Sequence, residues 1–278
     1  RSLVASSHPG DMCRMPANLR DDYDRDGFII HDAPLIERDL VDRASEGMDA
    51  LRRGEYETGV PPQSSYWNPG DPADKLCKIE LPQLASRAIM ELVSHSDIGR
   101  VAAEITGADM VQVWWVQLLG KPATTPGQEA ATRVGWHQDR QYWGAWEADA
   151  QLLTAWVAVS DVAADAGPMR FVDGSHRWGL LDRGDFYGQD NDALKDEIGA
   201  PDGETWAETP AILPPGGVSF HDCQTFHASG SNHSGEMRRS FAIHLRTNRA
   251  EPKDGKRQGL TQFIDDESRC PVIFGALS

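Results

Sequence analysis

The hydrophobic residues of this chain change their spacing near residue 110. Before that point they recur at helical intervals, and after it they fall in short runs rich in β-branched and aromatic residues. Helices followed by many short strands favour a jelly roll or a sandwich that carries a helical layer. The predicted strands are 110–118, 152–159, 167–172, 216–220 and 240–246.

The first third of the chain predicts three amphipathic helices. Apolar residues recur at helical spacing over 40–51, with Gly54 as a stop, over 84–92, and over 96–107. No repeat or low-complexity linker divides the chain, so we expect one domain over 1–278. Its expected parts are a helical part (1–108), a jelly-roll core (109–250) and a C-terminal tail (251–278).

The segment 181–208 interrupts the predicted strands. It holds nine acidic residues against Arg183 and Lys195. Such a long irregular insertion is usually a solvated loop or a lid over a site. We expect substrate specificity to depend on this insertion and on 56–76 and 140–150.

Charge and cysteine content exclude several classes of partner. With 27 basic and 43 acidic residues the net charge is −16, which repels nucleic acid and anionic membranes. No apolar run approaches the roughly 20 residues of a membrane span, and residues 1–12 lack the apolar region of a secretory signal. The cysteines lie far apart without a CxxC pair, so we expect reduced thiols and a cytoplasmic location. They are Cys13, Cys77, Cys223 and Cys270.

The stretch DYDRDG at 22–27 imitates the start of a calcium-binding loop. Such a loop also needs a carboxylate at its twelfth position, where this chain has Ala33. We therefore expect a polar turn before the strand-like 28–30.

The stretch GWHQDRQYWGAW at 135–146 places His137 and Asp139 two residues apart. In an extended backbone such residues point to the same face, so both can bind one metal ion. The similar His95-Ser96-Asp97 lies in a helical context, where residues two apart diverge. The alternative for 135–146 is a strand with surface polar residues whose aromatics fill the core.

One His and one carboxylate leave a metal ion under-coordinated. A second His would complete the two-His-one-carboxylate set of non-haem Fe(II) oxygenases. The later stretch 220–246 offers four candidates, and each taken singly is more often structural. They are His221, His227, His233 and His244.

Four blocks of the chain resemble the phytanoyl-CoA dioxygenase family: GWHQDRQYW, TAWVAVSDV, AGPMRFVDGSHRWG and FHASGSN followed by an Arg. The resemblance runs from about residue 26 to about residue 246. It implies a double-stranded β-helix, which is a jelly roll, that binds Fe(II) and uses 2-oxoglutarate and O2. It also implies His137, Asp139 and His227 as the catalytic metal ligands, and disfavours His221.

The same resemblance implies a site for 2-oxoglutarate. Arg238, in preference to Arg239, would pair its planar guanidinium with the distal carboxylate. Ser229 would donate to the same carboxylate. Further expected contacts are Gln117, Trp156 and the more distant Lys78.

The presence of Asp139 implies hydroxylation, because halogenating members of the family carry a small residue there. O2 would be consumed, and succinate and carbon dioxide released. Residues between and after the ligands are expected to contact the substrate; they are Gln138, Tyr142, Trp143 and Trp146. Trp114 and Trp115 should point to opposite faces of their strand, so that only one faces inward.

Aromatic walls suit an apolar or ring-bearing small molecule. We see no basic cluster to receive the phosphates of a CoA thioester. Two alternatives stay open: a non-catalytic jelly roll that binds a ligand, and a metal enzyme, such as an isomerase, that needs no 2-oxoglutarate. Oligomeric state is not indicated by the sequence.

Overall fold

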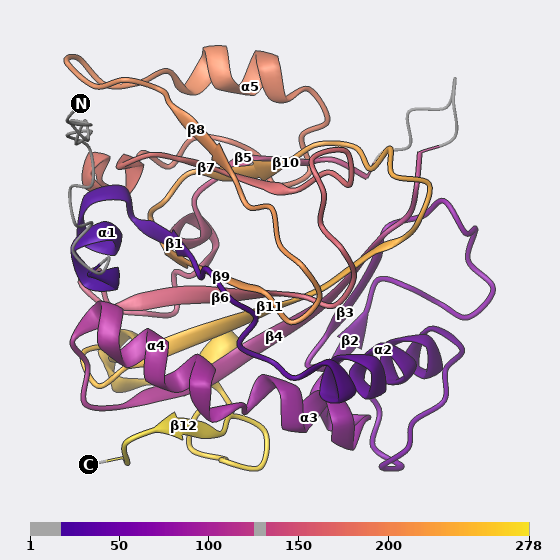
Figure 1. Ribbon diagram of the computed structural model, residues 1–278. Coiled ribbons are helices and arrows are strands. Elements are labelled where there is room, and N and C mark those ends of the chain that lie inside the picture. The colour runs from indigo at the N-terminus through magenta and orange to yellow at the C-terminus, as the bar shows by residue number, and fades with distance from the viewer. Residues whose placement is uncertain (1–17, 125–131, 278) are drawn as a thin grey trace, which may run out of the picture.

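Two antiparallel sheets lie face to face in the computed structural model, which describes residues 18–124 and 132–277 (Figure 1). The larger sheet has the order β1 (Phe28–Ile30), β9 (Val218–Asp222), β6 (Leu152–Ala158), β11 (Arg238–Thr247), β4 (Val111–Lys121), β3 (Cys77–Glu80) and β2 (Ser64–Ser65), and β12 (Val272–Phe274) also pairs with β4. The smaller sheet has the order β5 (Val134–His137), β10 (His227–Ser229), β7 (Met169–Val172) and β8 (Glu208–Pro210). This architecture confirms the predicted jelly roll.

Helices cover the outer faces of both sheets (Figure 1). Those against the larger sheet are α2 (Arg38–Arg52), α3 (Arg87–Val93) and α4 (Ser96–Thr106). The helix α1 (Leu19–Asp26) precedes β1, and α5 (Asn191–Ile198) packs on β5. Short 3-10 turns are η1 (Pro82–Leu84), η2 (Asp139–Tyr142), η3 (Ser175–Trp178), η4 (Lys253–Gly255) and η5 (Gly259–Thr261).

Two of the three predicted helices are confirmed. The apolar residues that predict the helix over 40–51 are all buried on α2: Leu40, Val41, Ala44, Met48 and Leu51. The helix predicted to start near Ser96 is α4, and Gly107 ends it with φ 64°, a left-handed value that glycine adopts without strain. The helix predicted over 84–92 is wrong at its start. Leu84 belongs to η1, and α3 begins only after Ser86, whose hydroxyl caps its first turn.

The polar turn predicted at 22–27 is wrong, because these residues are the last turns of α1. Asn18 caps the start of this helix, and Gly27 ends it with φ 80°. Arg25 pairs with Asp22 one turn before it. Tyr23 is buried, so α1 packs one face against the core although most of its residues are charged.

Alternation along the strands of the larger sheet separates two cores. On β6, Leu153, Ala155 and Val157 pack against the helical layer. Their neighbour Trp156 packs into a second core between the two sheets, together with Phe171 of the smaller sheet. Side chains on this inner face are therefore enclosed between the sheets.

A β-bulge in β4 overturns the expectation that only one of Trp114 and Trp115 faces inward. His244 of β11 lies opposite Trp115, whereas the next residue, Leu245, lies opposite Val113. Trp114 is thus an extra residue, and it shifts the alternation by one. Both indoles consequently lie in one buried cluster on the inner side of the sheet.

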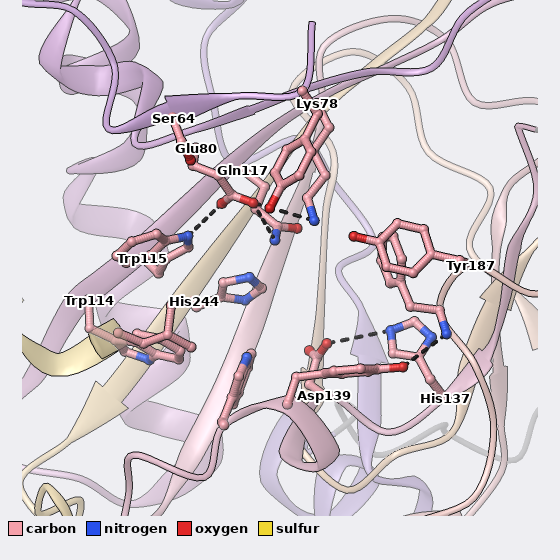
Figure 2. A pocket seen from close by; sticks show the side chains of 15 residues that line it. Ser64, Lys78, Glu80, Trp114, Trp115, Gln117, His137, Asp139, Tyr187 and His244 are labelled. Atoms are coloured by element: carbon pink, nitrogen blue, oxygen red, sulfur yellow. Dashed lines mark hydrogen bonds and ion pairs between the residues drawn. The ribbon is translucent and has the colours of Figure 1, made fainter. Parts of the chain in front are cut away.

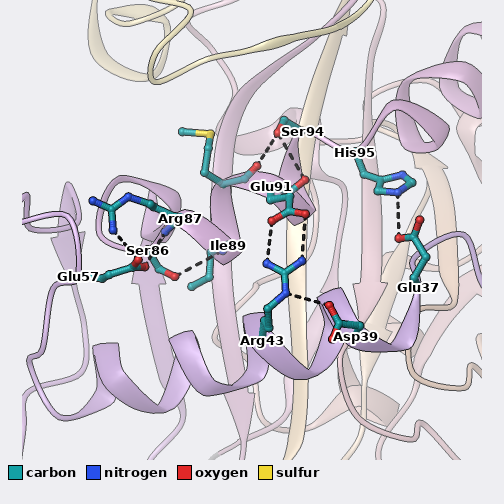
Figure 3. A network of polar contacts seen from close by, with 11 residues as sticks. Glu37, Asp39, Arg43, Glu57, Ser86, Arg87, Ile89, Glu91, Ser94 and His95 are labelled. Carbon is teal, nitrogen blue, oxygen red and sulfur yellow. Dashed lines mark hydrogen bonds and ion pairs between the residues drawn. The ribbon is translucent and has the colours of Figure 1, made fainter.

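Ion pairs join the helices of the outer layer (Figure 3). Arg43 of α2 donates to both carboxylate oxygens of Glu91 on α3, at 2.7 and 3.0 Å. His95 lies 3.3 Å from Glu37 and its ring accepts from the Asp97 amide. The His95-Ser96-Asp97 stretch is therefore the start of α4, remote from the space between the sheets.

The insertion 181–208 is not irregular throughout, because it contains α5 and pairs with β5. The Gly135 amide donates to the Phe186 carbonyl, and the Asp185 amide to the Trp136 carbonyl, each at 3.0 Å. A Cβ on Gly135 would lie 2.1 Å from the Asp185 carbonyl oxygen, so glycine permits this close approach. The insertion therefore lies against the strand that carries His137.

Among the residues that the structure describes, no helix is both long and apolar enough to span a bilayer. Cys13 and the predictions about residues 1–12 lie outside the described residues.

Gly99→Ala tests the packing of the C-terminal strand β12 on α4. A Cβ there would lie 2.2 Å from the Ile273 carbonyl oxygen. We expect a loss of about 2 kcal/mol in the free energy of unfolding, although alanine favours a helix over glycine. Urea denaturation measures it. Gly144→Ala, where a Cβ meets nothing within 4 Å, is the control; equal losses would contradict the packing.

Candidate metal centre

Two histidines face each other across neighbouring strands of the smaller sheet. His137 of β5 and His227 of β10 are directly opposed, and their ring centroids lie 4.2 Å apart. Both side chains are buried. Residues far apart in sequence thus place two imidazoles at one point.

Backbone carbonyl groups fix the orientation of both rings. His137 Nδ1 donates to the Gly135 carbonyl oxygen at 2.7 Å, and His227 Nδ1 donates to that of Thr225 at 2.9 Å. Each Nε2 atom is therefore unprotonated in the neutral ring and available as a ligand. Burial, and then the nearby His137, lower the pKa of His227 well below its usual value, which keeps it neutral.

Asp139 completes the group. Its Oδ1 lies 3.6 Å from Nε2 of His137 and 3.6 Å from Nε2 of His227. Its Oδ2 accepts from Thr154 at 2.9 Å and lies 3.3 Å from His221 Nε2. Burial alone would raise the pKa of Asp139, but the three histidines outweigh it and hold this pKa well below its usual value.

The three side chains fit a metal ion. One ligand atom of each lies within 4.8 Å of the others, and in the described part of the chain no other group of His, Cys, Asp and Glu has this arrangement. The three ligand atoms thus converge on a space that one metal ion could share. Two neutral imidazoles and a carboxylate on one face are the donor set of non-haem Fe(II).

His221, the disfavoured alternative, lies behind the group. Its ring centroid is 4.4 Å from that of His227, but its Nε2 faces the outer oxygen of Asp139. His244 is also buried, which lowers its pKa to about 4, and its Nδ1 lies 2.9 Å from the Thr154 hydroxyl. Both histidines support Asp139, directly or through Thr154.

A cavity on one side of the triad, here called the inner cavity, leads to Arg238. Four of the five residues expected to bind 2-oxoglutarate line it: Gln117, Trp156, Ser229 and Arg238. The three side chains of the triad line the same cavity. Lys78 is not among its lining residues.

Arg238 is buried, and the described residues provide it with no carboxylate. Its guanidinium lies over the Trp156 ring, 5.1 Å from the centroid, and donates to the Gly167 carbonyl, while Nε has no partner. Burial lowers its pKa to about 10, so it is still charged at neutral pH. The neighbouring Arg239 pairs with Asp49 of α2 on the opposite face, so Arg238 alone of the two reaches the cavity.

A second cavity, here called the outer cavity, has a volume of about 240 Å³, and His137 and Asp139 of the triad line it (Figure 2). Seven aromatic side chains line it; they are Tyr66, Trp114, Trp115, Tyr142, Trp143, Phe186 and Tyr187. Of the residues expected to contact the substrate, Tyr142 and Trp143 therefore lie in the wall.

The structure does not bring Gln138 or Trp146 into either cavity. The Gln138 carboxamide donates to the carbonyls of Gly179 and Gln224 and accepts from the Leu181 amide. Trp146 is buried against Trp114.

A polar pair lies at the far end of the outer cavity from the triad (Figure 2). Glu80 accepts from the Trp115 indole at 2.5 Å and lies 3.4 Å from Lys78 Nζ. The Lys78 ammonium lies between the rings of Tyr66 and Phe186, 5.1 and 4.8 Å from their centroids.

Sequence reasoning missed several of these residues. Phe186 and Tyr187 lie in an acidic insertion whose pattern gives no sign that it reaches the cavity. Glu80 lies in a strand too short to show alternation. Thr154 could have been predicted from the sequence, because it lies two residues before Trp156 on one strand and therefore shares its face.

Comparisons with known proteins agree with this geometry. The model of the phytanoyl-CoA dioxygenase family matches residues 23–240. An ectoine dioxygenase from Bordetella parapertussis is 28% identical over 229 residues, and the alignment covers 76% of this chain and 68% of that protein.

Solved structures share the fold. The 2-oxoglutarate-dependent carbocyclase SnoK from nogalamycin biosynthesis has a TM-score of 0.64 at 20% identity, covering 88% of this chain and 89% of that one. EctD from S. alaskensis, solved with 2-oxoglutarate and 5-hydroxyectoine, has a TM-score of 0.62 at 18% identity, covering 87% and 79%.

Paired substitutions distinguish the third ligand from its neighbour. His227→Ala should abolish Fe(II) binding, because two ligands remain. His221→Asn should weaken it by about tenfold, as expected for a group that orients a ligand. Anaerobic calorimetry measures both, and a larger loss in His221→Asn than in His227→Ala would contradict the assignment.

Proposed function

Because this chain belongs to the phytanoyl-CoA dioxygenase family, we propose that His137, Asp139 and His227 hold its iron. The protein is an Fe(II)- and 2-oxoglutarate-dependent dioxygenase that acts on a small organic molecule. Bound there, the iron supplies the oxidising chemistry, in which O2 is consumed and 2-oxoglutarate leaves as succinate and carbon dioxide. The observation that carries the ligand assignment is the 3.6 Å approach of both imidazoles to the same oxygen of Asp139.

The inner cavity supports a site for 2-oxoglutarate. Arg238 offers a charged, buried guanidinium with an unpaired Nε, and Ser229 lines the same cavity. We infer that these two bind the distal carboxylate. The Trp156 ring stacks on Arg238 and restricts it, and Gln117 lines the same cavity beside the triad.

The outer cavity supports a substrate with an apolar or ring-bearing body and one polar group. Its aromatic wall suits the body. Within the described part of the chain, the acidic partner of Lys78 is Glu80, so its ammonium has donors left for a carbonyl, hydroxyl or carboxylate of the substrate. Among the described residues, Lys78 is also the one Lys or Arg in the cavity lining, which disfavours the several phosphates of a CoA thioester.

Asp139 favours hydroxylation as the outcome, because its carboxylate occupies the position that a halide would need. Thr154 and His221 contact Oδ2 of Asp139, and Oδ1 therefore faces the two imidazoles.

Phe186 of the insertion packs on His137 with ring centroids 5.1 Å apart. The insertion 181–208 is thereby proposed to shield the triad from water.

Two further proposals concern organisation. The parts 1–108, 109–250 and 251–278 are proposed to form one domain, since Gln112 of β4 donates to carbonyls of Ile264 and Cys270 in the tail.

A cytoplasmic location is proposed from thiols that form no disulfide among the described residues: Cys77, Cys223 and Cys270. The charge of −16 supports a partner that is neither nucleic acid nor an anionic membrane.

Succinate release tests the reaction. Protein supplied with Fe(II), 2-oxoglutarate and O2 should release succinate slowly without a substrate. His137→Ala should lower this rate at least about a hundredfold, because a metal ligand is lost. His95→Ala, in the helical layer, is the control and should retain the wild-type rate. Undiminished turnover in His137→Ala would refute the assignment.

Lys78→Met decides between two roles for that lysine. A substrate found by screening ring-bearing metabolites for stimulated succinate release should show a KM raised about tenfold, with the KM for 2-oxoglutarate unchanged. The exposed Lys75→Met serves as the control. If the KM for 2-oxoglutarate rises instead, Lys78 contacts the co-substrate, as the family resemblance implied.

A further inference from the structure

Lys121 and Arg238 form an unusual pair of like charges. Lys121 ends β4 and lies directly opposite Arg238 in the pairing of β4 with β11. The Lys121 side chain is wholly buried and that of Arg238 nearly so. Like charges opposite each other on neighbouring strands are destabilising.

Neither cation has an acidic partner in the described part of the chain. Lys121 Nζ donates to the Ser229 hydroxyl at 2.7 Å and to the Gly230 carbonyl at 2.6 Å. Burial, followed by the charges of Arg238 and Arg133, lowers the pKa of Lys121 well below its usual value. Buried charges need a compensating partner, and an anion bound in the inner cavity would supply it.

The contact between Lys121 and Ser229 also determines where the Ser229 hydroxyl can donate its hydrogen bond. An anion bound beside Lys121 favours its protonated form. That form has donors and no acceptor, so the Ser229 oxygen then accepts from Lys121. The hydroxyl proton of Ser229 is then free to be donated elsewhere. Ser229 and Arg238 line the inner cavity. Lys121 does not line it and contacts Ser229 instead.

We propose that Lys121 is a positioning residue for the distal carboxylate of 2-oxoglutarate. It turns the Ser229 hydroxyl towards the cavity and adds a second positive charge beside Arg238. This inference rests on the proposed co-substrate site. Its consequence is that Lys121 contributes to selecting a dicarboxylate over a 2-oxo acid with one carboxylate.

Two ligands of equal chain length test the proposal. Anaerobic calorimetry on the Fe(II)-loaded protein compares 2-oxoglutarate with 2-oxovalerate, which lacks the distal carboxylate. In Lys121→Met the binding of 2-oxoglutarate should weaken by about tenfold or more, and that of 2-oxovalerate by less than about twofold. A merely structural role would weaken both alike.

Stability provides a second readout. Without ligand, Lys121→Met should unfold at the same temperature as the wild type or higher, because the repulsion with Arg238 is removed. Lys75→Met, at the surface, is the control and should change neither measurement. If the Met variant does not fold, Lys121→Gln, which keeps a donor without the charge, should show the same loss of preference.

Three results separate the possible failures. Unchanged binding of 2-oxoglutarate in Lys121→Met, or equal losses for both ligands, would overturn the role of Lys121. A wild type that binds both ligands equally well would instead overturn the proposed co-substrate site at Arg238.

Discussion

The pairing of β5 with β10 is the constraint on which the site depends. It sets His137 opposite His227, and the carbonyls of Gly135 and Thr225 then fix the orientation of the two rings. A slip of one residue in either strand would point one imidazole to the other face. Because β10 has only three residues, its register depends on β7, which pairs with its other edge.

The space between the sheets holds charges that the described residues do not neutralise. Arg238 and Lys121 lie opposite each other without an acid among the described residues, and two imidazoles and a carboxylate converge at the triad. Such arrangements lower the stability of the folded protein and persist where a ligand compensates them. The other face of the larger sheet buries a continuous apolar core against the helical layer, and this burial offsets the loss of stability.

The outer cavity brings together side chains from distant segments of the chain. The bulge at Trp114 brings two consecutive indoles to one side, and the insertion 181–208 adds Phe186 and Tyr187. The pair of Lys78 and Glu80 then makes one end of an aromatic cavity polar. A fold shared with a carbocyclase and with EctD does not determine the substrate, so we expect specificity to depend on these side chains.

The sequence by itself determined the fold class, most helices and strands, and the three residues now proposed as metal ligands, because periodicity and a spaced family motif are local signals. The sequence also indicates the bulge, because the buried valines at 111 and 113 occupy odd positions, whereas Val116 and Leu118 on the same face occupy even ones. Only the tertiary structure decided which residues share a cavity. Contacts such as Lys121 with Ser229, or Phe186 with His137, join segments whose approach depends on sheet packing, and no local pattern encodes that distance.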